Sequence, residues 1–383
     1  MDSTIGINNT LSTGDSTGLT IMMLMMVILV PMVGIMMAIT PYLMKKSECF
    51  AVTVPETALH DPYLRALKKR YLAIMLIVTA LFTGVCVIGV IADNELATMV
   101  LFTAGLLLII IIGYGLMLQN RSKVRVYKKE QNWVATQQEA VAVVAGEKTP
   151  GAISLKWNLV YLVVILLTFA IGSAGYAKMP DLVPMHMGFD GSVSYVEKTA
   201  SLIWMPVLIQ AFIGLVFLFS HWMIIRSKRQ TNPSAPATSA LAYGMFARAQ
   251  SMYLLAIGVI ISIALVTMPL AFMGAVTLMQ AAIFIMVGAI VAVVGGIAIA
   301  VVYGQGGSRV FARMQASEVL LADDDRYWKL GIFYYNPQDP SLFLLERFGV
   351  GWTVNFARPA VWVIMVGFVV VTLGFIVAII ALS

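Results

Sequence analysis

Long apolar runs alternate with short polar segments along most of the chain. A helix needs about 20 mostly apolar residues to cross the roughly 30 Å hydrocarbon core of a bilayer. Eight runs reach this length: 20–43, 71–92, 97–118, 157–177, 201–224, 250–272, 276–303 and 361–382. The pattern therefore predicts an all-α polytopic membrane protein with eight transmembrane helices.

The composition agrees with this pattern. Hydrophobic residues make up 60% of the 383 residues and charged residues only 11%, against about 25% charged residues in an ordinary soluble domain. The first 19 residues contain two acids and no Lys or Arg, whereas a secretory signal begins with a basic region. We expect the first apolar run to be retained as a helix after an extracellular tail.

Basic residues are strongly biased to one side of the predicted membrane. With the N-terminus outside, 23 of the 25 Lys and Arg residues fall in cytoplasmic segments or at their edges, and only Lys178 and Lys198 lie outside. This is the distribution that the positive-inside rule describes. It predicts a multi-pass protein of the cell membrane with both termini extracellular. The net charge of +6 then reflects topology and contact with the anionic lipid bilayer, so we expect no direct nucleic-acid binding.

The polar segments divide the chain into an ordered series of units. The division is an extracellular tail 1–19, three helices 20–118 with a basic cytoplasmic loop 45–70, a cytoplasmic segment 119–156, two helices 157–224 with an extracellular loop 178–200, a cytoplasmic linker 225–249, two helices 250–303, a cytoplasmic region 304–360 and a last helix 361–383.

The cytoplasmic segments carry their own local patterns. Loop 45–70 has a short alternating piece followed by a basic amphipathic helix that leads into the second span. Segment 119–156 mixes strand-like alternation with basic residues, and "TNPSAPATSA" (231–240) has the composition of a mobile linker. In 304–360, "NPQDP" predicts a turn and "WTVNF" alternates with a period of two, so we expect a small β element against the inner membrane surface.

Several kinds of chemistry are missing from the sequence. The middle of every predicted span lacks Asp, Glu, Lys, Arg and His, which ion-coupled transporters usually carry. The chain has none of the common motifs for zinc hydrolysis, acyl transfer or phosphate binding. Cys49 and Cys86 fall in different compartments and predict neither a disulfide nor a metal site. We therefore expect no enzymatic activity and no cofactor.

The outer loop holds the polar residues that suggest a binding site. His186 lies between Asp181 and Asp190, and one imidazole with two carboxylates could hold a divalent cation. A histidine that braces a turn is the more common arrangement. Both readings remain open on the sequence.

Two inner patterns allow a binding or a structural reading. "YGQGGSR" (303–309) offers Gly306, Gly307 and Arg309 to an anion, although a glycine C-cap followed by an arginine at the headgroups is more usual. "DDDRYW" (323–328) could bind a cation, or it could be a solvated cap before the next element.

The outer stretch "PDLVPMHMGFDGSVSYVEK" (180–198) resembles domain-of-unknown-function family 1648. The matching positions are Pro180, Pro184, His186, Gly191 and Lys198. Met187 replaces a phenylalanine of the family pattern, and Ser194 stands where an acid is frequent. The best-known context of that family is the immunity protein that protects a Gram-positive cell from its own secreted Sdp-type toxin. The resemblance implies a toxin-immunity or envelope-signalling role, with the ligand-binding residues Pro184, His186, Asp190, Gly191 and Lys198.

Residues 304–359 resemble a second domain-of-unknown-function family, numbered 5808. The resemblance rests on Gly-Gln-Gly-Gly, an Asp run before Arg-Tyr-Trp-Lys, "FYYNPQDP" and "ERFGVGWTVNFARP". It implies kinship with multi-pass membrane proteins of Gram-positive bacteria. The residues that we expect to contact a cytoplasmic partner or an anion are Gly306, Gly307, Arg309, Trp328, Asn336 and Arg347.

Three functions fit the sequence. The first is a non-enzymatic immunity or signal-sensing protein, whose outer loop engages a secreted peptide toxin or envelope ligand and whose inner face engages a regulator protein. The second is a transporter or flippase for a lipid or amphiphile, which predicts a polar cavity or lateral groove. The third is a membrane-integral enzyme acting on a lipid-linked substrate, which requires clustered acids and bases at one interface.

Overall fold

The computed structural model describes residues 12–45, 47–55, 58, 60–92, 95–133, 150–187, 193–229, 235–314 and 324–382. Within this part of the chain, eight helical segments are long and apolar enough to cross a bilayer. They are Met23–Leu43, Pro62–Ile91, Leu96–Glu130, Leu155–Lys178, Ala200–Arg226, Pro236–Phe272, Leu278–Met314 and Pro359–Leu382. The predicted all-α polytopic membrane fold is confirmed.

The helices and strands follow one another in a simple order. The α-helices are α1 (Ser12–Leu43), α2 (Pro62–Ile91), α3 (Glu95–Glu130), α4 (Leu159–Gly175), α5 (Trp204–Arg226), α6 (Pro236–Leu265), α7 (Thr267–Phe272), α8 (Leu278–Tyr303), α9 (Ser308–Met314) and α10 (Pro359–Leu382). The strands are β1 (Glu48–Cys49), β2 (Val52–Thr53), β3 (Leu182–Met187), β4 (Val193–Glu197), β5 (Trp328–Lys329), β6 (Phe333–Tyr334), β7 (Phe343–Leu345) and β8 (Trp352–Val354). The 3₁₀ turns are η2 (Leu155–Asn158), η3 (Tyr176–Lys178), η4 (Ala200–Ile203), η5 (Gln305–Gly307) and η6 (Asp325–Tyr327).

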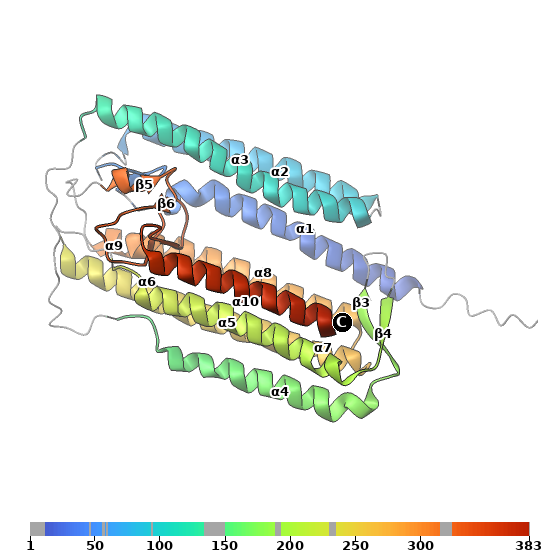
Figure 1. The fold of residues 1–383 in the computed structure, drawn as a ribbon. Helices are drawn as coiled ribbons and strands as arrows, with labels where there is room; N and C mark the ends of the chain where they lie inside the picture. The colour runs from blue at the N-terminus through green and yellow to red at the C-terminus, as the bar shows by residue number, and fades with distance from the viewer. Residues whose placement is uncertain are drawn as a thin grey trace, which may run out of the picture.

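The long helices form two packed groups (Figure 1). The first group is α1, α2 and α3, and the second is α4, α5, α6, α8 and α10. Helix α1 packs against α2 and α3 and also against α8, so it joins the groups. Helix α10 packs on α5, where the rings of Phe212 and Phe375 stack with centroids 4.3 Å apart. Most of the α10 surface remains exposed apolar side chains, as expected of a helix that faces lipid.

Short two-stranded antiparallel sheets lie at both ends of the bundle. The β3–β4 hairpin lies at one end together with the C-terminus, and we call this the hairpin end (Figure 1). At the opposite end, which we call the basic end, residues 324–358 form two small sheets, β5–β6 and β7–β8. We call residues 324–358 the cap. The predicted β element between the last two spans is confirmed.

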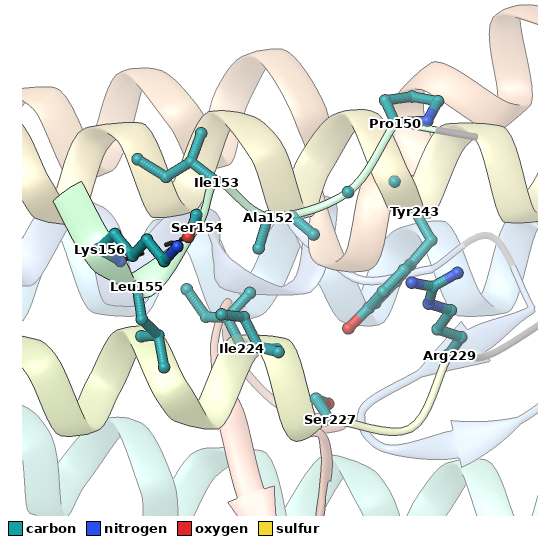
Figure 2. A pocket seen from close by; sticks show the side chains of 14 residues that line it. Pro150, Ala152, Ile153, Ser154, Leu155, Lys156, Ile224, Ser227, Arg229 and Tyr243 are labelled. Atoms are coloured by element: carbon teal, nitrogen blue, oxygen red, sulfur yellow. Dashed lines mark hydrogen bonds between the residues drawn. The ribbon is translucent and has the colours of Figure 1, made fainter. Parts of the chain in front are cut away.

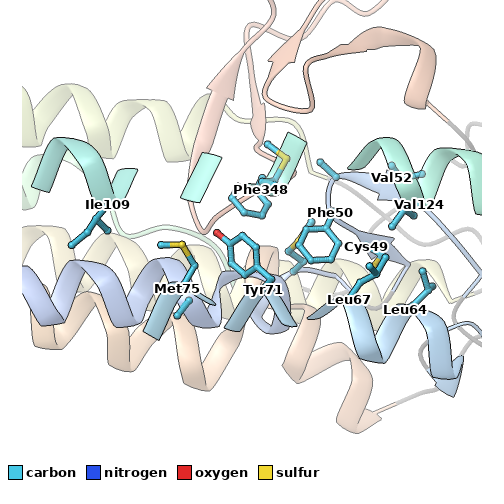
Figure 3. Packing of buried hydrophobic residues seen from close by; sticks show 14 of the residues in the cluster. Cys49, Phe50, Val52, Leu64, Leu67, Tyr71, Met75, Ile109, Val124 and Phe348 are labelled. Carbon is cyan, nitrogen blue, oxygen red and sulfur yellow. The ribbon is translucent and has the colours of Figure 1, made fainter. Parts of the chain in front are cut away.

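A buried aromatic core attaches the cap to the first helix group (Figure 3). The ring of Tyr71 on α2 lies edge-on to Phe50, with centroids 5.5 Å apart, and to Phe348 of the cap, 6.3 Å away. Met75 and Val124 are fully buried in the same cluster. Phe50 comes from the β1–β2 turn, so three segments distant in sequence share one core and the cap has a fixed position on α1–α3.

The expected strand-like structure at the start of segment 119–156 is wrong. Helix α3 continues to Glu130. The buried positions are Met117, Asn120, Arg121 and Val124, which recur at the spacing of one helix face. Two of these four are polar, so the helical period is hidden from a pattern based on hydrophobicity alone.

The linker "TNPSAPATSA" is also shorter than expected. Its last five residues, 236–240, form the first turns of α6, with Pro236 at the start of the helix, where a missing N–H costs nothing. The helix expected in the second part of loop 45–70, leading into the second span, is confirmed. Helix α2 begins at Pro62, and the carboxylate of Asp61 accepts a hydrogen bond from the N–H of Leu64 at 3.0 Å.

Candidate functional site

The β3–β4 hairpin presents one face to the bundle and one to solvent. The strands pair from Leu182 opposite Glu197 to Met187 opposite Val193, with a register shift between Pro184 and His186. A proline cannot donate to the ladder, so an irregular pairing beside Pro184 is expected. Successive side chains of each strand point to opposite faces.

The inner face of the hairpin closes the end of the second helix group. Val183 and Met185 of β3 are buried against Leu202, Met205 and Phe272, which come from η4, α5 and α7. Ile379 of α10 packs against the same cluster. The hairpin is therefore anchored by apolar contacts to helices of the bundle.

The outer face of the hairpin gathers side chains suited to recognition. Leu182 is 58% exposed and Tyr195 is 57% exposed. His186 and Glu197 are also exposed, and the Ser194 hydroxyl donates to the His186 carbonyl oxygen at 3.4 Å. An imidazole, a phenol, a carboxylate and an aliphatic side chain therefore share one solvent-facing surface, which we call the hairpin face: Leu182, Pro184, His186, Tyr195 and Glu197.

Lys198 closes the base of the hairpin. Its backbone N–H donates to the Asp181 carbonyl oxygen at 2.9 Å, and its ammonium donates to the Met179 carbonyl oxygen at 2.9 Å. The same ammonium lies 4.8 Å from the centre of the Tyr176 ring. These contacts hold Lys198 at the edge of the hairpin face.

The candidate cation ligands of the outer loop are only partly placed. Asp190 and Gly191 lie outside the described residues. His186 and Asp181 are both exposed. Among the residues that the structure describes, no three His, Cys, Asp or Glu side chains lie close enough together to hold a metal ion.

At the basic end, the glycine-rich turn after α8 clamps the cap. Gln305 is fully buried, and its side-chain amide donates to the carbonyl oxygens of Glu346 (2.7 Å) and Gly351 (3.2 Å) and accepts from the Gly351 N–H (3.2 Å). Gly306 and Gly307 have φ values of 58° and 82°, which glycine adopts most easily. A side chain at Gly307 would overlap the Ala242 carbonyl oxygen.

Arg309 binds helix ends in this structure. Its guanidinium donates to the Val301 carbonyl oxygen of α8 at 2.6 Å and to the Tyr42 carbonyl oxygen of α1 at 3.4 Å. Carbonyls at a helix C-terminus lack partners within the helix and attract a cation. Arg309 thereby ties the ends of α1 and α8 together.

Arg347 is the centre of a buried charge cluster in the cap. The side chain is 4% exposed and forms ion pairs with the carboxylates of Asp324 and Asp325. It also donates to the Thr53 hydroxyl at 2.9 Å, and its guanidinium lies 5.2 Å from the centre of the Trp328 ring. Trp328 itself is buried, and its indole N–H donates to Asp324 at 3.2 Å.

The charge cluster joins three segments of the chain. Asp325 accepts hydrogen bonds from the N–H and hydroxyl of Thr53 in β2, at 3.0 and 2.8 Å, and pairs with Lys128 of α3 at 2.8 Å. Arg121 of α3 donates to the carbonyl oxygens of Ala51 and Trp328. The cluster therefore fixes the cap on the β1–β2 loop and on the end of α3.

The protonation states in the cluster follow from burial and pairing. Burial opposes ionisation of Asp325, but Arg347 and Lys128 outweigh it and hold the pKa of Asp325 well below its usual range. Burial also opposes the charge of Arg347, and the carboxylates of Asp324, Glu48 and Asp325 overcome it and raise the pKa of Arg347. Burial raises the pKa of Glu48, against the opposing effect of Lys45 and Arg347.

Asn336 belongs to a second polar network, built on the "NPQDP" turn. Fully buried Asn355 donates to the carbonyl oxygens of Asn336 (2.9 Å) and Asp339 (3.0 Å) and accepts from the Asn336 N–H (3.1 Å). The Asp339 carboxylate accepts from Tyr334 at 3.0 Å and from Lys228 at 2.6 Å. These bonds connect the turn to β8 and to the end of α5.

Sequence reasoning found some members of these networks and missed others. Trp328, Asn336 and Arg347 lie in one small cap, although Trp328 and Arg347 belong to one network and Asn336 to the other. Gln305, Asp325 and Asn355 were not selected individually. The signal for Asn355 is a polar side chain inside the apolar stretch "WTVNF", where burial requires a specific hydrogen-bond partner. Gln305 and Asp325 lie in the polar patterns "YGQGGSR" and "DDDRYW", where no local signal marks the buried residue.

Among known protein families, a match is found for part of the cap and the first residues of α10. A protein-family model described as a family of unknown function (DUF5808) matches residues 337–362. This range holds Asp339, Arg347 and Asn355, which carry the polar networks above. No model of family 1648 matches the outer hairpin. No curated protein and no solved structure matches the chain.

Proposed function

We propose that this chain is a non-enzymatic membrane sensor of the toxin-immunity type. In this proposal the hairpin face binds a secreted peptide toxin or another envelope ligand, and the cap binds a regulator protein on the other side of the membrane. The observation that carries the proposal is that two helices connect the ends of the bundle: α8 packs against β3 and leads into the cap, and α10 follows the cap and packs with Ile379 against the cluster beneath the hairpin. The resemblance of 180–198 to family 1648 supports the same role.

The form of the hairpin supports binding of a peptide. Among the described residues, β4 pairs with β3 alone, so its other edge offers unpaired backbone N–H and C=O groups. A peptide in extended conformation can add to such an edge, with pockets or side chains of the sheet face supplying specificity. Tyr195 and His186 lie on that face beside the edge, and tyrosine is among the side chains that contribute most to binding energy at interfaces.

Helices α8 and α10 give binding at the hairpin a physical route to the cap. At the hairpin end, α8 packs against β3, and Ile379 of α10 packs into the cluster beneath β3. At the basic end, α8 leads directly into Gln305, which holds the 346–351 loop, and α10 begins immediately after Arg358, whose guanidinium donates to the Asp339 carbonyl oxygen at 2.6 Å. A shift of either helix would therefore displace bonded residues of the cap.

The orientation in this proposal rests on charge. The cap end carries nearly all Lys and Arg residues, so the cap is cytoplasmic and the hairpin and C-terminus are extracellular by the positive-inside rule. We propose a Gram-positive cell membrane as the location, from the family resemblance. Single cysteines at His186 and at Lys329, both exposed positions, test the orientation with a membrane-impermeant maleimide on intact cells.

The native thiols favour this labelling test. Cys49 and Cys86 are free and buried, and burial raises the pKa of Cys49 to about 11, so its reactive thiolate is scarce at neutral pH. Labelling of His186→Cys without labelling of Lys329→Cys supports the orientation. The reverse pattern would rule out an extracellular hairpin.

The binding role is tested by exposing cells to toxin. Cells that carry the chain, and cells from which it has been deleted, are challenged with secreted peptide toxins and with envelope antibiotics. Selective toxin sensitivity on deletion, reproduced by His186→Ala and Tyr195→Ala, supports the proposal. Lys178→Ala is the matched control, because Lys178 is exposed at the same end but lies outside the hairpin face. Equal sensitivity of the deletion and parent strains to every toxin would refute the role.

A transporter or flippase for a lipid or amphiphile is the second candidate. It is favoured by buried polar side chains between α4, α5 and α6: the Gln210 amide donates to the Ser262 carbonyl oxygen at 2.9 Å, and His221 bonds Asn158 at 2.8 Å. Deletion that leaves toxin sensitivity unchanged but alters the distribution of lipid between leaflets would favour this function. The acids and bases of the charge cluster pair with one another and hold the cap in place, so this cluster does not favour a membrane-integral enzyme.

A further inference from the structure

A cavity of about 530 Å³ lies at the basic end, where α4, α5 and α6 leave the apolar part of the bundle. Its walls come from residues 150–156, from the end of α5 with the segment that follows it, and from one face of α6 (Figure 2). The volume is in the range of small-molecule binding sites. It belongs neither to the hairpin face nor to the polar networks of the cap.

The cavity is electropositive. Lys156 and Arg229 line it, and none of the described residues that line it is Asp or Glu. Lys156 is the second residue of the apolar segment Leu155–Lys178, and Arg229 lies just after the apolar segment Ala200–Arg226. Both cations are therefore at the membrane boundary. This is the level at which lipid headgroups lie when the bundle is in a bilayer.

Two buried hydroxyls lie close together in the cavity wall. Tyr243 is 3% exposed and Ser227 is 7% exposed. Among the described residues, neither hydroxyl makes a hydrogen bond of good geometry, although Ser227 and the Trp352 indole lie near the Tyr243 hydroxyl. Figure 2 shows the Tyr243 ring reaching from α6 toward Ser227, with the guanidinium of Arg229 beside it. A buried polar atom without a partner costs about 1–3 kcal/mol, so a ligand that accepts hydrogen bonds would relieve this cost.

The rest of the lining is apolar. Leu155, Ile224 and Ile225 line the cavity beside the polar groups. Leu159 and Leu162 continue the apolar surface along the outer side of α4, where both are exposed. A ligand in this position meets cations and hydroxyls at one end and an aliphatic surface at the other.

We propose that this cavity binds the phosphate headgroup of an anionic glycerophospholipid. The phosphate oxygens accept hydrogen bonds from Tyr243 and Ser227 and pair with Arg229 and Lys156, and an acyl chain follows the aliphatic surface of α4. A free phosphate ion shares the headgroup chemistry but gains nothing from the apolar surface. This site is independent of ligand binding at the hairpin.

The test measures lipid binding to the full chain in a detergent that removes native lipid. Phosphatidylglycerol and phosphatidylcholine are titrated separately and followed by native mass spectrometry. We expect preferential binding of phosphatidylglycerol, and Arg229→Gln should weaken it roughly tenfold or more, as for loss of one hydrogen bond to a charged group. Arg248→Gln is the matched control, because Arg248 is an exposed residue of α6 that does not line the cavity.

The role of the Tyr243 hydroxyl is tested by thermal unfolding, with and without lipid. In lipid-free detergent, Tyr243→Phe should change the melting temperature little or raise it, because the buried hydroxyl makes no hydrogen bond of good geometry with the described residues. With phosphatidylglycerol, the rise in melting temperature should be smaller for Tyr243→Phe than for the parent chain. A drop in melting temperature in both conditions would mean that the hydroxyl is structural and would overturn the proposed contact.

Two further outcomes decide the nature of the ligand. Inorganic phosphate that binds as tightly as phosphatidylglycerol, and displaces it, would overturn the lipid assignment. Equal effects of Arg229→Gln and Arg248→Gln would show that general charge, and not this cavity, attracts the lipid. Weak competition by phosphate together with a selective loss in Arg229→Gln supports the site.

Discussion

Replacement of Arg347 by methionine should make the cap open from the helix bundle much more often. Methionine retains much of the aliphatic volume but cannot pair with Asp324 or Asp325 or donate to the Thr53 hydroxyl. The pKa of Asp325 is held down by Arg347 and Lys128 against its burial. Without Arg347, both ion pairs to Asp324 and Asp325 are lost, while Lys128 still pairs with Asp325.

The magnitude follows from the burial of the charges. Removing one partner of a buried ion pair costs about 3–5 kcal/mol, mainly because the remaining charge is left uncompensated. The Arg347 side chain is almost fully buried, whereas Asp324 is half exposed and can recover some hydration, so we expect the lower half of this range. At 1.36 kcal/mol for each factor of ten, about 3–4 kcal/mol corresponds to roughly 150- to 900-fold more frequent opening of the cap.

Hydrogen–deuterium exchange of the β7 and β8 amides measures that opening directly. Arg326→Met is the matched control: Arg326 is exposed, and its guanidinium contacts only the neighbouring Tyr327 among the contacts described, so exchange should change less than about threefold. Exchange in Arg347→Met that is less than about tenfold faster than in the parent chain would refute the view that this cluster holds the cap in place.

Three further predictions test other parts of the molecule. Gly307→Ala should destabilise the turn after α8 by about 1–3 kcal/mol in a thermal unfolding assay, because its φ is positive and the added methyl group overlaps a carbonyl oxygen. Gly115→Ala is the control: it has open space around it and should leave the melting temperature unchanged or raise it. Burial raises the pKa of Glu346 to about 7, above its value of about 4.3 in an unfolded chain. The folded cap therefore loses stability as the pH rises from about 4 to 7. Glu346→Gln should slow amide exchange of the cap at pH 8 and change it little at pH 5, and an equal change in exchange rate at the two pH values would contradict this. His186→Cys should react with a maleimide rapidly in the folded protein, since the position is exposed, and protection by an added peptide ligand would be measured as a slower rate.

The bundle was predictable from the sequence because one energetic term dominates it. In lipid, the backbone N–H and C=O groups of a long apolar run must be hydrogen-bonded within the protein, and a helix achieves this within the run itself. Such runs are identified by composition alone. The helix ends were less predictable. Helix α3 extends past the apolar run because Arg121 finds carbonyl oxygens of Ala51 and Trp328, and no local pattern reveals those partners.

The cap was predictable in kind but not in detail. Alternation in "WTVNF" and the turn in "NPQDP" predict short strands, and strands are found on both sides of the turn. The pairing of Arg347 with Asp325 and Thr53, however, joins residues that are 22 and nearly 300 positions apart. Such partners depend on the docking of the cap onto α1–α3, which only the three-dimensional arrangement specifies.

The same distinction governs the functional residues. In the cap, the residues with the strongest sequence signal, Trp328, Asn336 and Arg347, bond to other parts of the cap and to the helices, so their polar groups are used in holding the structure together. On the hairpin face, His186 is exposed. In the cavity of Figure 2, the Tyr243 and Ser227 hydroxyls make no hydrogen bond of good geometry with the described residues. Polar groups that the fold leaves available are the ones that a ligand can use. We therefore propose that an envelope ligand binds at the hairpin and that lipid binds at the basic end. The buried polar residues of the cap position the helices between these two sites, and its exposed surface is left for the proposed regulator protein.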